Sequence, residues 1–224
     1  MDYYEKALYN HILSTQNSKT GGFVYFTPMR SGHYRVYSQP QTSFWCCVGS
    51  GLENHARYGE MIYAHHEKDV YVNLFIPSKL DWKEQGLVIE QHSAFPEQSY
   101  TELTVIPRRK SEFTLYIRKP EWADNCRMLV NGQVHSAQPN DHGYLAVQRT
   151  WKKNDVVRFE FDMPVRVEAL PDKSSNYSIL YGPVVLAAQM GEDKMNGMFA
   201  DDSRGGHIAS GPQLPLAKMP VIVG

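Results

Sequence analysis

The sequence lacks the marks of three large classes of protein. It contains no run of about 18 apolar residues, so no segment is expected to span a membrane as a helix. Its 23 Lys and Arg residues do not outnumber its 24 Asp and Glu residues, and without a basic excess a nucleic-acid partner is disfavoured. Only three cysteines occur, two of them adjacent, which does not make the disulfide framework of a small secreted domain.

What is present is the composition of a folded domain. Apolar residues make up 42% and charged residues 21%, both ordinary values. With 224 residues, the chain is long enough for one large domain or two small ones around a real hydrophobic core. Aromatic residues reach 12%, which favours β structure and also suits a site that stacks against sugars. Composition alone does not separate these two interpretations.

Two helices are expected near the start of the chain. Tyr4, Leu8 and Ile12 recur at the four-residue spacing of one helix face. A second helix is expected directly after the adjacent cysteines. Ser50 and Glu53 there have the spacing of a capping box, in which the two side chains bind free amides of the first turn.

From residue 69 the apolar period changes from about 3.6 to 2, which indicates strands. The strongest local signal is Asn131-Gly132, since these residues supply the two positive φ angles of a type I′ hairpin turn. Short strands at such regular spacing predict an antiparallel β-sandwich. The expected strands cover residues 70–76, 87–91, 101–106, 113–117, 128–130, 133–135, 144–148, 156–161, 165–170, 177–180 and 184–189.

The predicted fold class is therefore mainly β, an antiparallel sandwich preceded by two helices. We expect a helical part over residues 1–66, the sandwich over 67–190 and a tail over 191–224. Residues 191–211 are polar and rich in glycine without a period, which is typical of a loop or a disordered tail. Residues 220–223 resemble the beginning of a further strand, so the tail is expected to lead into a further, truncated β domain.

The adjacent pair Cys46-Cys47 is the feature most in need of explanation. Three interpretations are open: two small buried apolar residues, a strained disulfide between neighbours, or a thiolate that binds metal or performs catalysis. The position favours the third. The pair precedes the positive end of the expected helix, which lowers a thiol pKa, and it follows a polar loop of the kind that carries functional groups.

The residues alone do not complete a zinc site, which usually has four ligands. His65 and His66 are expected at the far end of the second helix, and at about 1.5 Å rise per residue they lie more than about 20 Å from the cysteines. We interpret His55 as a residue of the helix face and Cys126 as a structural residue at the edge of a strand. Spacing by itself therefore supports a metal site only weakly.

The run Ser43-Phe-Trp-Cys-Cys-Val-Gly-Ser-Gly-Leu-Glu-Asn-His55 resembles the cysteine-pair motif of the β-L-arabinofuranosidases, a glycoside hydrolase family once grouped under a domain of unknown function. It is most similar to the GH146/GH127-like branch common in gut bacteria that degrade plant pectins. Such a collinear resemblance, over nearly the whole chain, is more specific than any single motif. Further matches follow in order at residues 4–10, 71–78, 117–123, 130–132 and 180–185.

The resemblance implies an (α/α)6 barrel followed by β-sandwich domains, so residues 1–66 would be the end of the catalytic barrel. It implies that three cysteines and one glutamate hold zinc, and that one thiolate of the adjacent pair is the nucleophile of a retaining mechanism. Carried over by position, Cys46 corresponds to the nucleophile and a zinc ligand, and Cys47 to the neighbouring zinc ligand. Glu5 and Tyr25 correspond to residues of the sugar pocket. Without the resemblance, Glu5 would be interpreted as an exposed helix charge and Tyr25 as a core aromatic residue.

The resemblance also implies what this chain does not carry. The family's acid/base glutamate, third zinc cysteine and zinc glutamate precede the region covered here. We therefore expect the parent protein to be a retaining β-L-arabinofuranosidase acting on plant cell-wall glycans, and this chain alone to be inactive, with weak or absent zinc binding. Its partner would be an arabinose-containing oligosaccharide or polysaccharide.

Two further expectations concern the surroundings of the chain. The barrel face of the two helices would favour self-association if left uncovered. The resemblance favours a periplasmic or secreted parent protein, although the first residues lack the basic and then apolar order of a signal peptide.

Two alternatives stay open. The first is a non-catalytic β-sandwich module that binds carbohydrate or serves as a structural accessory, because sandwiches host many functions. Such a module would not need a cysteine pair beside a helix. The second is a redox sensor with a disulfide between neighbouring cysteines, which would gain two hydrogens on reduction and be indifferent to zinc chelators.

Overall fold

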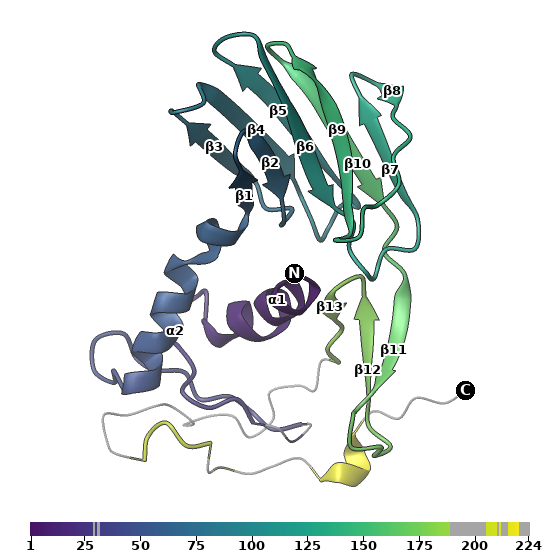
Figure 1. The fold of residues 1–224 in the computed structure, drawn as a ribbon. Helices are drawn as coiled ribbons and strands as arrows, with labels where there is room; N and C mark the ends of the chain where they lie inside the picture. Colours follow the sequence, from purple (N-terminus) through teal and green to yellow (C-terminus); the bar gives the residue numbers. More distant parts are fainter. Residues whose placement is uncertain (29, 31, 189–204, 210, 212–214, 220–224) are drawn as a thin grey trace. The chain divides into compact units, whose positions relative to one another are not determined.

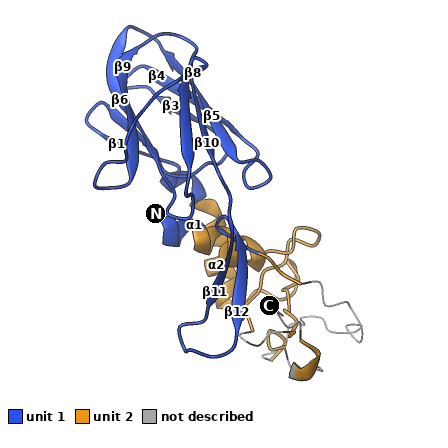
Figure 2. Cartoon of the chain, turned by 90° about the vertical axis from the view of Figure 1, so that its right-hand side faces the viewer, with its two compact units in different colours: residues 1–5, 58–185 blue, residues 6–57, 186–224 orange. Residues whose placement is uncertain are grey.

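The computed structural model describes residues 1–28, 30, 32–188, 205–209, 211 and 215–219 (Figure 1). The chain divides into two compact units, residues 1–5 with 58–185 and residues 6–57 with 186–224 (Figure 2). Most of the loop expected over 191–211 and the strand expected over 220–223 lie outside the described residues. No helix in the described part of the chain is long and apolar enough to cross a membrane.

The first unit contains a β-sandwich of two sheets. One sheet has the strand order β1-β2-β6-β9 and the other the order β3-β4-β5-β10-β7-β8 (Figure 1). Neighbouring strands are antiparallel except β2 and β6, which run parallel. The strands are β1 (Tyr63–His66), β2 (Asp69–Val72), β3 (Ser78–Trp82), β4 (Leu87–Ser93), β5 (Tyr100–Pro107), β6 (Ser111–Arg118), β7 (Cys126–Val130), β8 (Gln133–Val134), β9 (Tyr144–Trp151) and β10 (Asp155–Phe161).

The period-2 pattern explains why these segments form a sandwich. Along β10, Val157, Phe159 and Phe161 are buried, so every second residue enters the core. From the segment after β2, the Phe75 ring lies 5.7 Å from Phe159 and 5.1 Å from Phe161, centroid to centroid. Burial of each such side chain contributes about 1.5–3 kcal/mol, and these rings join the two sheets. The mainly β, sandwich-type prediction is confirmed.

Two local predictions in this unit have clear outcomes. Asn131 and Gly132 have φ angles of 50° and 78°, which confirms the hairpin turn between β7 and β8. The expected last strands do not join the sandwich. They form a three-stranded sheet of their own: β11 (Val165–Ala169), β12 (Tyr177–Tyr181) and β13 (Val184–Val185).

The first helical segment runs through α1 (Asp2–Ala7), a π-helical turn (Leu8–Ile12) and a 3₁₀ turn (Leu13–Thr15). The expected continuous helix over Tyr4, Leu8 and Ile12 is thus present, with changes of winding. The first unit holds residues 1–5 of this segment, and the second holds the rest.

The second helix, α2 (Cys46–Ala56), has its N-cap at Trp45, five residues before the N-cap predicted at Ser50. The capping-box interpretation of Ser50 and Glu53 is wrong, because both residues lie inside the helix. The N-cap is Trp45, which makes no side-chain cap bond. Its carbonyl accepts a hydrogen bond from the N–H of Val48 at 3.0 Å, which closes the first turn from the backbone alone.

The end of α2 also differs from the prediction. The helix stops at Ala56 and is followed by a 3₁₀ turn over Tyr58–Met61. His65 and His66 were expected at the end of the helix but lie in β1, because this segment pairs with β2 through His65–Val70 and His66–Asp69. Pairing at the sheet edge overrides the helical period suggested by the sequence.

Candidate active site

The cysteine pair occupies the first two positions of α2. Both side chains are exposed, so Cys46 and Cys47 are not the small buried residues of the plainest interpretation. Their sulfur atoms lie 3.9 Å apart, far beyond the bond of about 2.05 Å in a disulfide. The first turn of the helix leaves backbone N–H groups without intrahelical partners, and its partial positive charge favours an anion here. The pair is therefore two free thiols at the positive end of a helix.

Tyr25 stands beside the first of these thiols. Its hydroxyl oxygen lies 3.4 Å from Sγ of Cys46, and either atom can donate the hydrogen bond. This bond, and then the contact with Cys47, hold the pKa of the Cys46 thiol below its ordinary value. The same bond with Cys46, and next one with Cys47, raise the pKa of the Tyr25 hydroxyl. The structure thus brings together three of the four residues expected at the site.

The segment that carries Tyr25 is held by close backbone packing. The N–H of Phe23 donates to Oγ of Ser38 at 2.9 Å, and the N–H of Ser38 donates to the carbonyl of Phe23 at 2.8 Å. A Cβ on Gly22 would lie 1.9 Å from the carbonyl oxygen of Ser38, so only glycine fits. Tyr25 follows two residues after Phe23, so this pairing fixes the backbone directly before it.

Phe23 also packs against α2. A Cβ on Gly51 would lie 3.2 Å from the buried Phe23 ring, so the absence of a side chain lets the helix approach closely. The His55 ring meets Phe23 edge to face at 5.0 Å, and its Nδ1 lies 2.8 Å from the carbonyl of Gly51. His55 therefore belongs to the helix face, as predicted, and the same contacts fix α2 beside the Tyr25 segment.

Other aromatic rings pack against the Tyr25 ring. The Tyr25 ring lies 4.6 Å from Phe26, 6.3 Å from Trp45 and 4.3 Å from His207, between centroids. The His207 ring in turn lies 5.2 Å from Trp45 and 5.4 Å from Phe26. Sequence reasoning missed His207, because it stands in a polar, glycine-rich stretch with no period. We call Tyr25, Phe26, Trp45 and His207 the aromatic cluster.

Glu5 lies in the first unit and has a different environment. Its side chain is fully buried, so the alternative interpretation of Glu5 as an exposed helix charge is wrong. One carboxylate oxygen accepts from Nη2 of Arg118 at 2.5 Å and the other from Nε1 of Trp122 at 2.8 Å. Burial raises the pKa of Glu5, although the charge of Arg118 opposes this. Arg118 also binds Asp2 at 2.9 Å and the carbonyl of Asn73 at 2.7 Å.

The other candidate metal ligands do not gather at the thiols. Cys126 is half-buried at the start of β7, and burial raises the pKa of its thiol to about 11. His65 and His66 lie in β1. Among the residues that the structure describes, no group of three or more His, Cys, Asp or Glu side chains is arranged to hold a metal ion.

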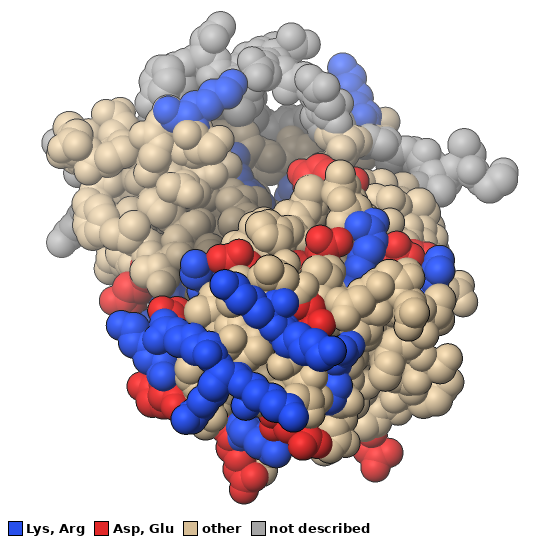
Figure 3. All heavy atoms as spheres, turned by 90° about the horizontal axis from the view of Figure 1, so that it is seen from above, with Lys and Arg blue, Asp and Glu red and all other residues tan. Residues whose placement is uncertain are grey.

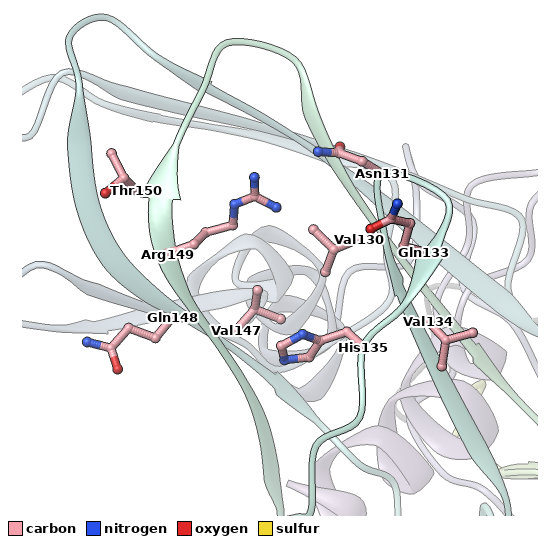
Figure 4. A pocket seen from close by; sticks show the side chains of 9 residues that line it. All are labelled: Val130, Asn131, Gln133, Val134, His135, Val147, Gln148, Arg149 and Thr150. Carbon is pink, nitrogen blue, oxygen red and sulfur yellow. The ribbon is translucent and has the colours of Figure 1, made fainter.

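A separate cleft of about 430 Å³ lies between the β7–β8 hairpin and β9, and Figure 4 shows the side chains of Val130, His135 and Arg149 along it. Its described lining is mainly polar and includes no carboxylate, thiol or large aromatic ring. Two turns of the sandwich (residues 108–110 and 152–154) are rich in Lys and Arg, and Figure 3 shows basic side chains interspersed with acidic ones on the face seen there. Neither feature contains a residue expected at the site.

Models of known protein families match three segments of the chain. A model described as the GH127 catalytic domain of β-L-arabinofuranosidase matches residues 1–60, and one described as the GH127 middle domain matches residues 69–163. The chain thus contains part of a catalytic domain followed by a middle domain. It belongs to the GH127 β-L-arabinofuranosidase family. A third model, described only as a domain of unknown function, matches residues 166–224.

Solved structures agree with this assignment. A GH127 β-L-arabinofuranosidase from Geobacillus stearothermophilus T6 is 27% identical, with a TM-score of 0.70 over 82% of this chain and 32% of that one. A structure described as the GH127 β-arabinofuranosidase BT3674 is 28% identical, with a TM-score of 0.71 over 82% and 32%. One described as a glycoside hydrolase is 28% identical, with a TM-score of 0.68 over 82% and 34%. The chain therefore spans about a third of the length of these relatives. No curated protein sequence matches it.

Proposed function

We propose that the full-length protein containing this chain is a retaining β-L-arabinofuranosidase with Cys46 as its nucleophile. The observation that carries the proposal is the arrangement at the start of α2. Cys46 is exposed, its sulfur lies 3.9 Å from that of Cys47, and the Tyr25 hydroxyl lies 3.4 Å from it. The family assignment supplies the reaction class, since one relative that matches this chain is described as a β-L-arabinofuranosidase and another as a β-arabinofuranosidase.

The two thiols suit a shared zinc ion. Zinc–sulfur bonds of about 2.3 Å in a tetrahedral site place neighbouring sulfur atoms about 3.8 Å apart. The observed separation of 3.9 Å is close to this value without any movement of the chain. Bound zinc would keep both thiols deprotonated at neutral pH. We propose that Cys46 and Cys47 hold it together with ligands from the part of the catalytic domain that this chain does not span.

The chemistry that follows assigns one role to each residue. The Cys46 thiolate attacks the anomeric carbon, the carbon–sulfur bond forms, and the bond to the leaving oxygen breaks as a general acid protonates that oxygen. Water then attacks the same carbon, the carbon–sulfur bond breaks, and the proton returns to the acid/base group. The Tyr25 hydroxyl, already within hydrogen-bond distance of Sγ, would contact the sugar held at this carbon.

Glu5 enters the proposal only through the family resemblance. Both of its carboxylate oxygens are bound within this chain, to Arg118 and Trp122. A contact with sugar would need one of these bonds to be shared or exchanged. Its place in the sugar pocket therefore stays a prediction, and its contacts support a role in fixing the start of α1.

The test is zinc content and hydrolysis of p-nitrophenyl β-L-arabinofuranoside by the full-length protein. We expect one bound zinc, turnover, and a loss of kcat greater than about a thousandfold in Cys46→Ser, because a covalent mechanism loses its nucleophile. Cys126→Ser is the matched control and should retain activity. A full-length protein without zinc that tolerates Cys46→Ser would show that the thiolate mechanism is wrong. We expect this chain alone to be inactive, since the family resemblance implies that the general acid lies in the part of the catalytic domain that the chain does not span.

The alternative of a carbohydrate-binding accessory module has one observation in its favour, the polar cleft beside the β7–β8 hairpin. Its amides, including Gln133 and Gln148, suit sugar hydroxyl groups, but no large aromatic ring lines it among the described residues. Calorimetric titration of this chain with arabinan oligosaccharides would detect such binding. Loss of that binding in Gln148→Ala would favour the accessory function over the enzyme for this part of the chain.

A further inference from the structure

The part of the chain matched by the model of unknown function reaches the cysteine site. His207 lies in residues 205–209, which the structure describes within the second unit together with Tyr25 and Cys46. It is far from them in sequence, yet its ring lies 4.3 Å from Tyr25 and 5.2 Å from Trp45. The segment thus contributes directly to the surroundings of the candidate nucleophile.

Two hydrogen bonds tie the segment in place. Nε2 of His33 lies 3.0 Å from the carbonyl oxygen of Ala209, and the Tyr34 hydroxyl accepts a short hydrogen bond from the N–H of Gly211. Both bonds are made by residues that follow His207 in the chain, Ala209 and Gly211. The position of the ring is therefore supported by the backbone and does not depend on ring stacking alone.

The ring itself is not held by a polar bond at its buried nitrogen. Nδ1 of His207 is buried and has no hydrogen-bond partner among the described residues. An unsatisfied buried nitrogen is costly, so each such atom in a folded protein calls for an explanation. Beside this backbone support, the ring contacts Tyr25, Phe26 and Trp45. The missing bond therefore points to a role of this ring beyond packing within the chain.

The ligand chemistry follows from the neighbours. A sugar at Cys46 would lie against the Tyr25 hydroxyl, 3.4 Å from the sulfur, and hence beside the aromatic cluster. Aromatic rings offer an apolar face to the C–H groups of a sugar, and Phe26 is 55% exposed, so the cluster has an open side in this chain.

We propose that His207 is a specificity-determining residue of this site, and that its ring, with Tyr25 and Trp45, forms an aromatic wall for the sugar bound at Cys46. The inference rests on the proposed function and extends it, because it assigns a role to the segment matched only by a domain of unknown function. His207 acts by contact with the sugar and takes no part in bond making or proton transfer.

The experiment uses the full-length protein and separates ring contact from hydrogen bonding. His207→Ala and His207→Gln should both raise KM for p-nitrophenyl β-L-arabinofuranoside by about threefold to tenfold, with kcat changed less. His207→Phe keeps a ring and should restore most of the loss. Zinc content and Tm should match those of the unmodified protein. Ile208→Ala is the matched control, because Ile208 is the exposed neighbour in the same segment.

A binding measurement makes the result independent of turnover. In the Cys46→Ser background, calorimetric titration with L-arabinose should show weaker binding when His207→Ala is added, by a similar factor. Changes below about twofold in both KM and affinity, or equal changes in Ile208→Ala, would overturn the proposal. If the Cys46→Ser protein remains active, the proposed thiolate mechanism fails separately, and the L-arabinose titration still decides the role of His207.

Discussion

The surroundings of Glu5 and of Cys46 show two opposite uses of ionisable groups in one chain. Glu5 is fully buried, and both of its oxygens are bound by Arg118 and Trp122. Cys46 is exposed, and the Tyr25 hydroxyl lies within hydrogen-bond distance of its sulfur. A buried charge must be paired because desolvation is expensive, whereas a reactive group must stay accessible. The buried network therefore stabilises the fold, and the open thiol is available for chemistry.

The largest effect on stability is expected at Arg118, which pairs with the buried Glu5. Arg118→Met leaves the Glu5 carboxylate buried without its cation, and we expect a loss of about 3–5 kcal/mol in the free energy of unfolding at pH 7. Urea unfolding of this chain, followed by tryptophan fluorescence, measures the loss. Lys119→Met changes the next residue, which is not part of the buried pair, and serves as the control.

The pH dependence of Arg118→Met provides a second check. Burial raises the pKa of Glu5, and the charge of Arg118 holds it down, so the variant should raise it further. Its carboxylate then takes up a proton more readily in the folded than in the unfolded chain, so stability falls as the pH rises through the folded pKa. The variant should be less destabilised at pH 5 than at pH 8. A deficit that does not change with pH would mean that Glu5 is not the group left unpaired.

A second buried carboxylate, Asp155, should behave in the opposite sense. Burial opposes its ionisation, but hydrogen bonds from the Lys152 N–H and the Asn131 amide, together with the charge of Arg149, outweigh burial and lower its pKa. Asp155→Asn should cost about 1–3 kcal/mol at pH 7.

The free energy of unfolding at acid pH distinguishes the ionic contribution of Asp155 from simple packing. A lowered folded pKa means that the stability from Asp155 is complete above the unfolded value of about 3.9 and is lost as the pH falls through the folded pKa. The difference between the unmodified chain and Asp155→Asn should therefore shrink below about pH 4. Unfolding curves at pH 7, 5 and 3 measure it, and a constant difference would contradict the assigned bonds.

At the open site, a substitution should change activity and leave stability alone. Tyr25→Phe removes the hydroxyl 3.4 Å from the Cys46 sulfur. In the full-length protein we expect kcat/KM to fall by a factor of about 3–10, which corresponds to one hydrogen bond of about 1 kcal/mol. Tm should stay within error. Tyr37→Phe removes a hydroxyl that binds the Ser14 carbonyl, and it serves as the matched control without a thiol contact.

The smallest effect should be found at Cys126. Its half-buried thiol has a pKa raised to about 11, so it is protonated at pH 8, whereas Cys46 and Cys47 are exposed. Iodoacetamide at pH 8 should label the adjacent pair first, as read by mass spectrometry of peptides. Cys126→Ser should change the free energy of unfolding by less than about 1 kcal/mol. Early labelling of Cys126 would show that accessibility does not separate the two kinds of cysteine.

Much of the fold was predictable because its signals are local. The period-2 pattern located the strands, and Asn131-Gly132 located a hairpin turn whose φ angles depend on those two residues. The start of α2 was not predicted correctly, because backbone closure at Trp45 needs no characteristic side chain, while Ser50 and Glu53 match a cap by chance. Strand pairing likewise decided that His65 lies in β1 and not in a helix.

The candidate site divides along the same line. The cysteine pair, its polar flank and the family resemblance could be recognised without a structure, because adjacent residues stay adjacent in any fold. The folded chain was needed to find that Arg118 and Trp122 bind Glu5, that Tyr25 contacts Cys46, and that His207 joins the aromatic cluster. These contacts join residues far apart along the chain, and their energies come from burial and geometry that no local pattern records.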